Sequence, residues 1–292
     1  MSDEKCKSQK IVAKTFRKAK RWYLSYVLWQ IIVLVFAVAS IFAEIDPKVS
    51  AVIAFVIVFS AEALRWLSDS WKSQGELAKR KLEMADGLGI PVDGPYIADW
   101  LAAKPKGFLE DVTAREIQGS EFDSVQPVGP RRLVENTQES AWWSKHLSRR
   151  MLFYLSIVLV FTTVCAFVAL TVSIAGLKNP TDPLAASTVQ YVGGVVCSTL
   201  VFILSINVVR LLLEFCAFAG DTREVLRQCA ELLKDADIDQ RDALWALHDY
   251  QTSRSLAPLI PTFVWKIRGA HLREQWANFR PLPKRAVNVA KG

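Results

Sequence analysis

Charged residues at the ends of long apolar stretches are the part of this sequence best suited to a chemical role. The segment "FSAEALRWLSDSW" (59–71) closes one apolar stretch with two acids and an arginine, and a similar group follows a later stretch. Opposite charges three or four residues apart lie on one face of a helix and can pair. Such pairs would mark where a helix leaves an apolar environment. We therefore interpret five residues as coupling or gating candidates: Glu62, Arg65, Asp69, Arg210 and Glu214.

The other reactive side chains form no catalytic or metal-binding pattern. His146, His248 and His271 fall in three different expected helices, and none has a second metal ligand three or four residues away. The five cysteines include no CxxC pair, and there is no Walker, GxSxG or strand-linked GxGxxG motif. Threonines inside the apolar stretches are expected to bond to their own helix backbone. We expect no enzyme, no catalytic residue, no metal and no cofactor.

Four uncharged stretches would position the charged pairs: 22–43, 49–61, 151–177 and 183–209. A helix needs about 20 apolar residues to cross the ~30 Å hydrocarbon core. The first, third and fourth stretches are long enough, and the second is long enough if Glu62 and Arg65 lie at its end. The first exceeds the apolar region of a signal peptide, so we expect an uncleaved anchor. A content of 51% hydrophobic residues agrees with a membrane protein.

Basic residues divide the intervening segments into two groups. Residues 1–21, 72–150 and 210–292 carry eight, twelve and thirteen lysines and arginines, whereas loops 44–48 and 178–182 carry one each. Because basic flanks are retained in the cytoplasm, we expect a multi-pass protein with both termini and the middle segment cytoplasmic. The basic N-tail would bind anionic lipid. No basic stripe with interleaved aromatics indicates a nucleic-acid polymer as partner.

This topology predicts an all-α membrane protein with four transmembrane helices in two hairpins, and a helical cytoplasmic domain built from the middle segment and the C-terminal tail. Each hairpin is preceded by a cluster of basic residues and ends with a pair of oppositely charged residues. This similarity fits either a weak internal duplication or the flanks that any such hairpin has. The expected parts are a basic cytoplasmic N-tail (1–21), transmembrane hairpin 1 (22–71), a cytoplasmic segment (72–150), transmembrane hairpin 2 (151–212), a cytoplasmic helical segment packing with 72–150 (213–280) and a disordered tail (281–292).

Helices are expected to continue beyond the apolar stretches. The second stretch extends to about Met84 through a heptad-like seam that should pack on another helix, formed by Leu67, Trp71, Gly75, Ala78, Leu82 and Ala85. Asn136 with Glu139, and Asp221 with Glu224, have the spacing of helix caps. Residues 107–130 are expected to be mostly loop. Further helices are predicted over 239–256 and from a cap at Thr262, the latter burying Trp265, Leu272 and Trp276.

Tryptophans mark the expected cytoplasmic interface of the membrane. Trp22, Trp66, Trp71, Trp142 and Trp143 fall near it, as an aromatic belt does. The ligand-binding residues stay unassigned by the sequence pattern. Four residues of the middle segment are the candidates: Trp142, Trp143, Arg131 and Arg132.

Two segments, "ENTQESAWWSKHLSRRM" (135–151) and "DYQTSRSLAPLIPTFVWKIRGAHLREQW" (249–276), carry a family resemblance. The chain resembles the SMODS-associating four-transmembrane effectors of bacterial anti-phage systems. The resemblance covers the whole layout of hairpins and cytoplasmic segments. Its most specific part is Tyr250, Gln251 and Arg254, followed by "PLIP", an aromatic-basic helix and Trp276.

This resemblance implies a CBASS-type effector in the bacterial inner (plasma) membrane. A synthase would make a cyclic oligonucleotide on infection, the cytoplasmic domain would sense it, and the membrane part would form a pore or disrupt the membrane, causing abortive infection. Four spans are too few to enclose a water path, so a homo-oligomer is expected. The alternatives are a constitutive membrane scaffold or partner-binding protein, and a small ion or solute transporter, which the lack of broken helices disfavours.

Overall fold

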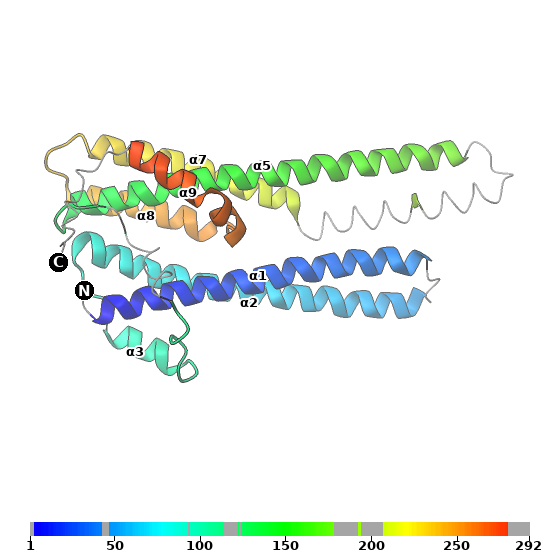
Figure 1. Cartoon of the computed structure of the whole chain (residues 1–292), viewed down its shortest axis with the longest axis horizontal. Coiled ribbons are helices and arrows are strands. Elements are labelled where there is room, and N and C mark those ends of the chain that lie inside the picture. The colour runs from blue at the N-terminus through cyan, green and yellow to red at the C-terminus, as the bar shows by residue number, and fades with distance from the viewer. Residues whose placement is uncertain are drawn as a thin grey trace, which may run out of the picture. The chain divides into compact units, whose positions relative to one another are not determined.

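The described part of the chain is helical. A computed structural model describes residues 3–42, 47–92, 94–113, 122, 124–177, 192–193 and 207–279, and these contain no strand (Figure 1). This confirms the all-α class. The helices are α1 (Asp3–Phe42), α2 (Pro47–Leu88), α3 (Gly94–Ala102), α5 (Pro130–Leu177), α7 (Val208–Leu232), α8 (Gln240–Leu256) and α9 (Thr262–Phe279). The expected tail 281–292, and nearly all of the fourth apolar stretch, lie outside the described residues.

One helix of the described chain is long and apolar enough to cross a membrane, over Pro130–Val168. Only 6% of its most apolar window is buried, so it does not resemble the core helix of a soluble protein. The threonines in this helix bond to its own backbone, as expected: Thr162 and Thr163 donate to carbonyls four residues earlier, at 2.8 Å each.

The chain forms two compact units, which are described separately. Unit 1 contains the described residues of Met1–Arg17, Trp71–Arg150 and Cys216–Gly292, and unit 2 contains those of Lys18–Ser70 and Met151–Phe215. Four helices, α1, α2, α5 and α7, contribute residues to both units without interruption. The helical backbone is therefore continuous at each of the four places where the chain passes from one unit to the other.

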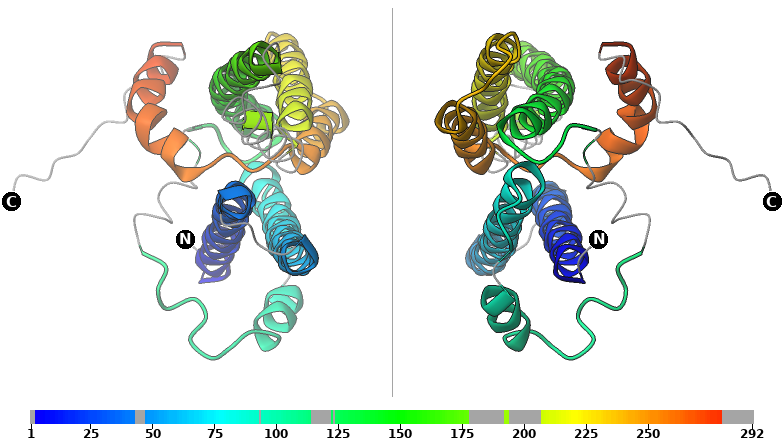
Figure 2. Two further views of the ribbon diagram at one scale, coloured as in Figure 1. Left: turned by 90° about the vertical axis from the view of Figure 1, so that its right-hand side faces the viewer. Right: turned by 90° about the vertical axis from the view of Figure 1, so that its left-hand side faces the viewer.

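In unit 2, α1 and α2 lie side by side (Figure 2). Ser68 donates its hydroxyl hydrogen bond to the carbonyl of Ala19 at 3.0 Å, and the Trp29 indole N–H donates to the carbonyl of Ile57 at 2.9 Å. Ala19 and Ser68 are fully buried. Small residues at such a contact let two helix backbones approach closely, and the polar bonds then set their register.

In unit 1, the first half of α1 packs on the second half of α2. Ile11 and Val12 share a buried cluster with Ala78 and Leu82, and Gly75 lies against Thr15 and Phe16. The seam predicted for α2 is thus buried on α1 from Gly75 to Leu82. The expected N-tail 1–21 is correspondingly the start of a long helix rather than a separate tail. Helix α3, which the sequence pattern did not predict, joins this cluster through Ile97.

A second cluster of unit 1 joins the middle segment to the C-terminal segment. Leu133, Val134 and Ala141 of α5 are fully buried among residues of α7 and α8. Their partners are Val225, Cys229, Ile238, Ala243, Ala246, Leu247 and Tyr250. Neither segment supplies this core alone, so the two stretches of chain stabilise one another.

The cap predictions at Asn136 and Asp221 are both wrong. Helix α5 begins at Pro130, whose fixed φ and missing N–H suit a first helical position, and Asn136 lies one and a half turns inside. Its amide donates to Asp86 at 2.9 Å, so its polarity serves a tertiary contact. Likewise α7 runs unbroken through Asp221. A cap residue is tolerated within a helix when the helix continues for other reasons, such as core packing.

The two C-terminal helices follow the expected ranges closely. Asp239 caps α8, its carboxylate accepting from the backbone N–H of Arg241 at 2.8 Å. In α9, Leu272 and Trp276 are buried as predicted, but Trp265 is 38% exposed and Val264 is buried in its place. Thr262 is the first residue of α9 rather than its cap.

Candidate functional site

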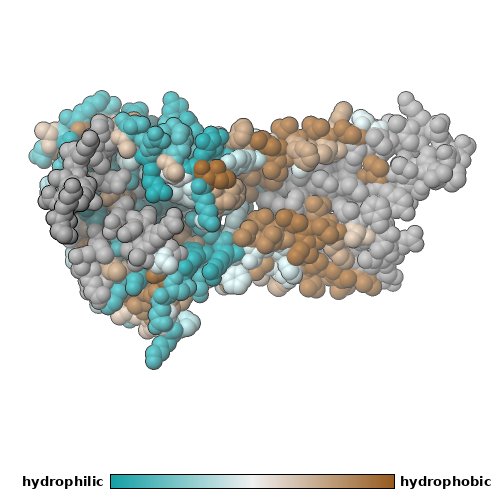
Figure 3. Space-filling model, in the orientation of Figure 1, coloured by the Kyte–Doolittle hydropathy of each residue, from teal (hydrophilic) through white to brown (hydrophobic). Residues whose placement is uncertain are grey.

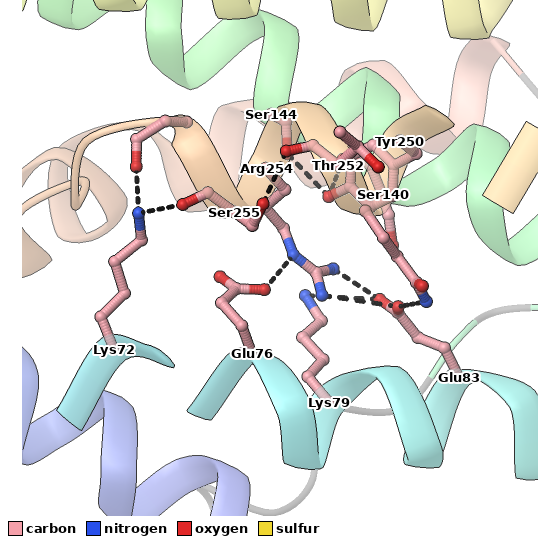
Figure 4. Close-up of polar contacts among 12 residues, drawn as sticks. Lys72, Glu76, Lys79, Glu83, Ser140, Ser144, Tyr250, Thr252, Arg254 and Ser255 are labelled. Carbon is pink, nitrogen blue, oxygen red and sulfur yellow. Dashed lines mark hydrogen bonds and ion pairs between the residues drawn. The ribbon is translucent and has the colours of Figure 1, made fainter. Parts of the chain in front are cut away.

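The most distinctive polar arrangement in unit 1 is a buried ion cluster between α2 and α8 (Figure 4). The guanidinium of Arg254 on α8 lies between two carboxylates of α2. Its Nε donates to Glu76 Oε2 at 2.6 Å, and its Nη1 donates to Glu83 Oε1 at 2.6 Å. All three side chains are less than 10% exposed. We refer to Glu76, Glu83 and Arg254 as the α2–α8 ion cluster.

Further side chains complete the hydrogen bonding of this cluster. The amide of Gln251 donates to Glu83 Oε2 at 2.9 Å, and the Lys79 ammonium is 3.8 Å from Glu83 Oε1. Tyr250 places its ring 5.1 Å from the guanidinium carbon of Arg254, and its hydroxyl forms a 3.0 Å hydrogen bond with Ser144 Oγ of α5. The cluster thus joins α2 and α8 directly, and reaches α5 through Tyr250.

Glu83 and Arg254 have shifted pKa values because each is buried next to opposite charge. Burial alone would raise the pKa of Glu83, but Arg254 and Lys79 lower that pKa below its usual range. Burial alone would lower the pKa of Arg254, but the two glutamates raise it well above its usual range. A general acid at neutral pH needs a raised carboxyl pKa, so Glu83 does not suit acid–base catalysis. A fully paired buried cluster instead suits a specific contact between helices, since losing one partner strands the other charges.

Next to the cluster, Lys72 fastens the end of α8 to α2. Its ammonium donates to the carbonyls of Ser255 at 2.8 Å and Ala257 at 2.5 Å (Figure 4). The last carbonyls of a helix have no hydrogen-bond partner within the helix. A lysine at this position donates to them, and its positive charge interacts favourably with the negative end of the helix dipole.

The ion cluster was missed by sequence reasoning, although a signal exists on α2. Lys72, Glu76, Lys79 and Glu83 are spaced by four, three and four residues, so they form one polar stripe on a helix whose other seam is apolar. That stripe alone reads as a solvated face. Its burial depends on Arg254, which lies 171 residues beyond Glu83 in the chain.

The arginines proposed as ligand-binding candidates already make internal contacts. Arg132 donates to both carboxylate oxygens of Asp86, at 3.1 and 3.2 Å from Nη2. Arg131 donates to the backbone carbonyls of Leu233 and Asp235, just beyond the end of α7. Their donors hold α5 to α2 and to the α7–α8 turn, so ligand binding would have to displace these bonds.

The two candidate tryptophans belong to an aromatic cluster between α5 and α9. Trp142 is 6% exposed, and its ring centroid lies 5.3 Å from that of Trp276 and 4.4 Å from that of His146. Trp143 is stacked on Trp265 at 5.3 Å. The geometry is that of a packing contact, which gives α9 a fixed position on α5.

The coupling candidates form two local pairs in unit 2. Glu62 and Arg65 approach to 4.0 Å, and Arg210 donates to Glu214 at 2.7 Å. Asp69 is exposed on α2, one turn beyond Arg65. The structure therefore brings together each pair that the spacing predicts.

Histidine, cysteine and acidic side chains are spread over the described ranges of the chain. Within those ranges no group of histidine, cysteine and acidic side chains could hold a metal ion, and Cys6, Cys165, Cys216 and Cys229 are free thiols. Comparison with models of protein families, with curated proteins and with solved structures gives no match.

Proposed function

We propose that this protein is a multi-pass membrane effector of anti-phage defence. Its four spans would form two hairpins in the bacterial inner membrane, and its helical domain would bind a cyclic oligonucleotide that triggers pore formation or membrane disruption. The observation that carries the proposal is the continuity of helices that are apolar and exposed in unit 2 but polar and ion-paired in unit 1. The ligand class and the defence role follow from the resemblance of residues 135–151 and 249–276.

Exposed apolar side chains on three helices support membrane placement. Soluble proteins rarely expose contiguous apolar patches beyond a few hundred Å². In unit 2, such side chains cover α1, α2 and α5 over many turns (Figure 3). They include Leu24, Leu28, Ile31, Ile32 and Val35 of α1, Val52, Phe55, Val56, Val58 and Phe59 of α2, and Phe153, Ile157, Val160, Phe161, Val164 and Phe167 of α5. Lipid tails would cover these side chains without cost.

The continuity of the helices supports signal transmission. Helix α2 has 42 residues and α5 has 48. At a rise of about 1.5 Å per residue, each is roughly twice as long as the hydrocarbon core is thick. A helix that crosses the membrane and also forms part of the sensing domain can convert a domain rearrangement into a shift of its span.

The α2–α8 ion cluster supports a two-state domain. A buried, fully paired contact is stable when intact and costly when half broken, so α8 would be either engaged with α2 or released from it. Ligand binding would change the balance between these states. The pairs Glu62–Arg65 and Arg210–Glu214 would then transmit the change at the cytoplasmic end of the spans.

The proposal is tested with purified full-length protein in liposomes loaded with a self-quenching dye. A panel of cyclic di- and trinucleotides is added, and we expect one of them to release the dye while the others do not. The proposal is contradicted if liposomes that contain correctly folded protein release no dye with any nucleotide. The scaffold alternative is supported if, in addition, overexpression leaves growth unaffected and a soluble partner copurifies.

Arg65→Ala tests the coupling role in the same liposomes. We expect normal insertion but a shifted nucleotide concentration for half-maximal dye release, because the variant removes one ionic contact at the end of the span. Arg227→Ala is the matched control, since Arg227 pairs with Glu224 on an exposed face of α7. Failure of the Arg65 variant to insert would show that the pair is structural.

A further inference from the structure

We infer that the turn between α8 and α9, together with the first two turns of α9, is an interfacial anchor that docks on an anionic bilayer surface. We call residues 255–268 the α8–α9 elbow. The inference rests on the proposed placement of unit 2 in the membrane. It adds a second, peripheral contact between the chain and the lipid, separate from the basic N-terminal segment.

The elbow is apolar on its outer side as well as on its inner side. Leu259 and Val264 are buried and attach the elbow to the rest of unit 1. Leu256, Phe263 and Ile267 are exposed by 77%, 51% and 61%. Phe263 and Ile267 are four residues apart and therefore lie on one face of α9. A well-packed turn that also presents large apolar side chains outward has the form of a docking surface.

The position of the elbow within unit 1 identifies the bilayer as its occupant. Lys72 donates to the carbonyl of Ser255, as Figure 4 shows, and also to the carbonyl of Ala257. Lys72 directly follows Trp71, the residue at which α2 would leave the membrane interface. The elbow is therefore held at the level of unit 1 where α2 enters it, which is the level of the lipid head groups.

The charge of this region also matches an anionic surface. From residue 250 to residue 273 the sequence contains no aspartate or glutamate. Lys266, Arg268 and Arg273 lie on α9, and Lys266 and Arg273 are exposed. Interfacial segments use both kinds of side chain, apolar ones such as Phe263 and Ile267 and basic ones such as Lys266. The basic groups would bind lipid phosphates while the apolar side chains enter the head-group region.

Depth-dependent fluorescence quenching in the full-length protein tests the anchor. Cys6, Cys165, Cys197 and Cys216 are replaced by serine, whereas Cys229 is kept, because burial raises the pKa of its thiol to about 12 and leaves it unreactive. An environment-sensitive fluorophore is then attached to a cysteine introduced by Phe263→Cys, Ile267→Cys, Phe161→Cys or Ala236→Cys. The protein is reconstituted in vesicles of phosphatidylcholine alone or of phosphatidylcholine mixed with the anionic lipid phosphatidylglycerol. Both kinds of vesicle carry lipid-attached quenchers.

We expect the labels at positions 263 and 267 to be quenched at least threefold more than the label at position 236. Ala236 is an exposed residue of the α7–α8 turn, at the opposite end of α8. The label at position 161, on an exposed face of α5, must be quenched by acyl-chain quenchers if α5 lies in the membrane. The anchor alone is overturned if the label at position 161 is quenched while the labels at positions 263 and 267 are quenched no more than the label at position 236. No quenching at 161 overturns the membrane placement and the anchor with it.

Two further arms distinguish a lipid partner from a second copy of the chain. Self-quenching between labels at position 263, without quenching by lipid, would assign the elbow to a contact between copies and overturn the anchor. The double variant Lys266→Gln/Arg273→Gln should reduce the excess quenching in anionic vesicles at least twofold. Lys234→Gln, which removes an exposed charge beyond the end of α7, should leave it unchanged. An equal loss in both variants would contradict a specific role for the charges of α9.

Discussion

Arg254 is the residue that neutralises the two buried glutamates of the α2–α8 ion cluster. Its guanidinium lies within hydrogen-bond distance of both Glu76 and Glu83. The two carboxylates lie seven residues apart on α2, which is two helical turns, so a single arginine can reach both. Because all three groups are buried, losing one of them costs more free energy of unfolding than the intact cluster contributes.

Arg254→Met should destabilise unit 1 by about 3–5 kcal/mol, since it leaves two buried carboxylates without their counterion. The expected observation is a lower midpoint of thermal unfolding in detergent, followed by tryptophan fluorescence. Adding Glu76→Gln and Glu83→Gln to this variant should recover part of the loss, because the stranded charges are then gone. A triple variant less stable than Arg254→Met would show that the carboxylates are not the source of the destabilisation.

Glu83 should make unit 1 sensitive to acid. The pKa of Glu83 is lowered in the folded protein, so its contribution to stability is present above the unfolded value of about 4.3 and is lost as pH falls through the folded pKa. Thermal unfolding measured from pH 7 to pH 3 should show a fall in midpoint beginning below about pH 5. The fall should be smaller in Glu83→Gln, which cannot titrate at this position. Equal slopes in the two proteins would contradict the assignment.

At the scale of elements, α2 is the helix around which unit 1 is assembled. One face packs on α1 through Gly75, Ala78 and Leu82, and its polar stripe pairs with α8. Near its end, Gly87 lies against Leu133 of α5, where a Cβ would meet the Leu133 Cδ1 at 2.5 Å and its Cα at 3.0 Å. The close approach of α2 and α5 therefore requires glycine at this position.

Gly87→Ala should lower the stability of unit 1 by about 1–3 kcal/mol, because the backbone of α5 must move to accept the methyl group. Gly220→Ala is the matched control. A Cβ at Gly220, within α7, meets nothing within 4 Å, so this change should be neutral or stabilise the helix by up to about 1 kcal/mol. Both effects are measured as shifts of the unfolding midpoint in detergent. Equal shifts for both variants would contradict the close approach at Gly87.

At the scale of the whole molecule, the distribution of basic residues makes a prediction that the helical fold does not test. Fusions of a fluorescent protein after residue 90 or at the C-terminus should fluoresce, and fusions of alkaline phosphatase in loops 44–48 and 178–182 should be active. This pattern corresponds to four spans with both termini in the cytoplasm. Phosphatase activity at the C-terminus would exclude an even number of spans with a cytoplasmic N-terminus.

Features that depend on a local pattern could be predicted from the amino-acid sequence. The helical class, the extension of α2 beyond its apolar stretch and the range of α8 all follow from residue spacing and from the break at "APLIP" (257–261). The Glu62–Arg65 and Arg210–Glu214 pairs follow in the same way, because their members are three or four residues apart. Such contacts need only one helix to form.

Features that depend on residues far apart in the chain became visible only in the folded structure. Asn136 has the type and spacing of a cap, but its partner Asp86 is 50 residues away, and the helix begins earlier at Pro130. Arg254 is 178 residues from Glu76, and no local pattern shows that the two meet. The free energy of a buried charge depends on its surroundings in space, so the same polar stripe of α2 would be a solvated face without α8 and becomes an ion cluster with it.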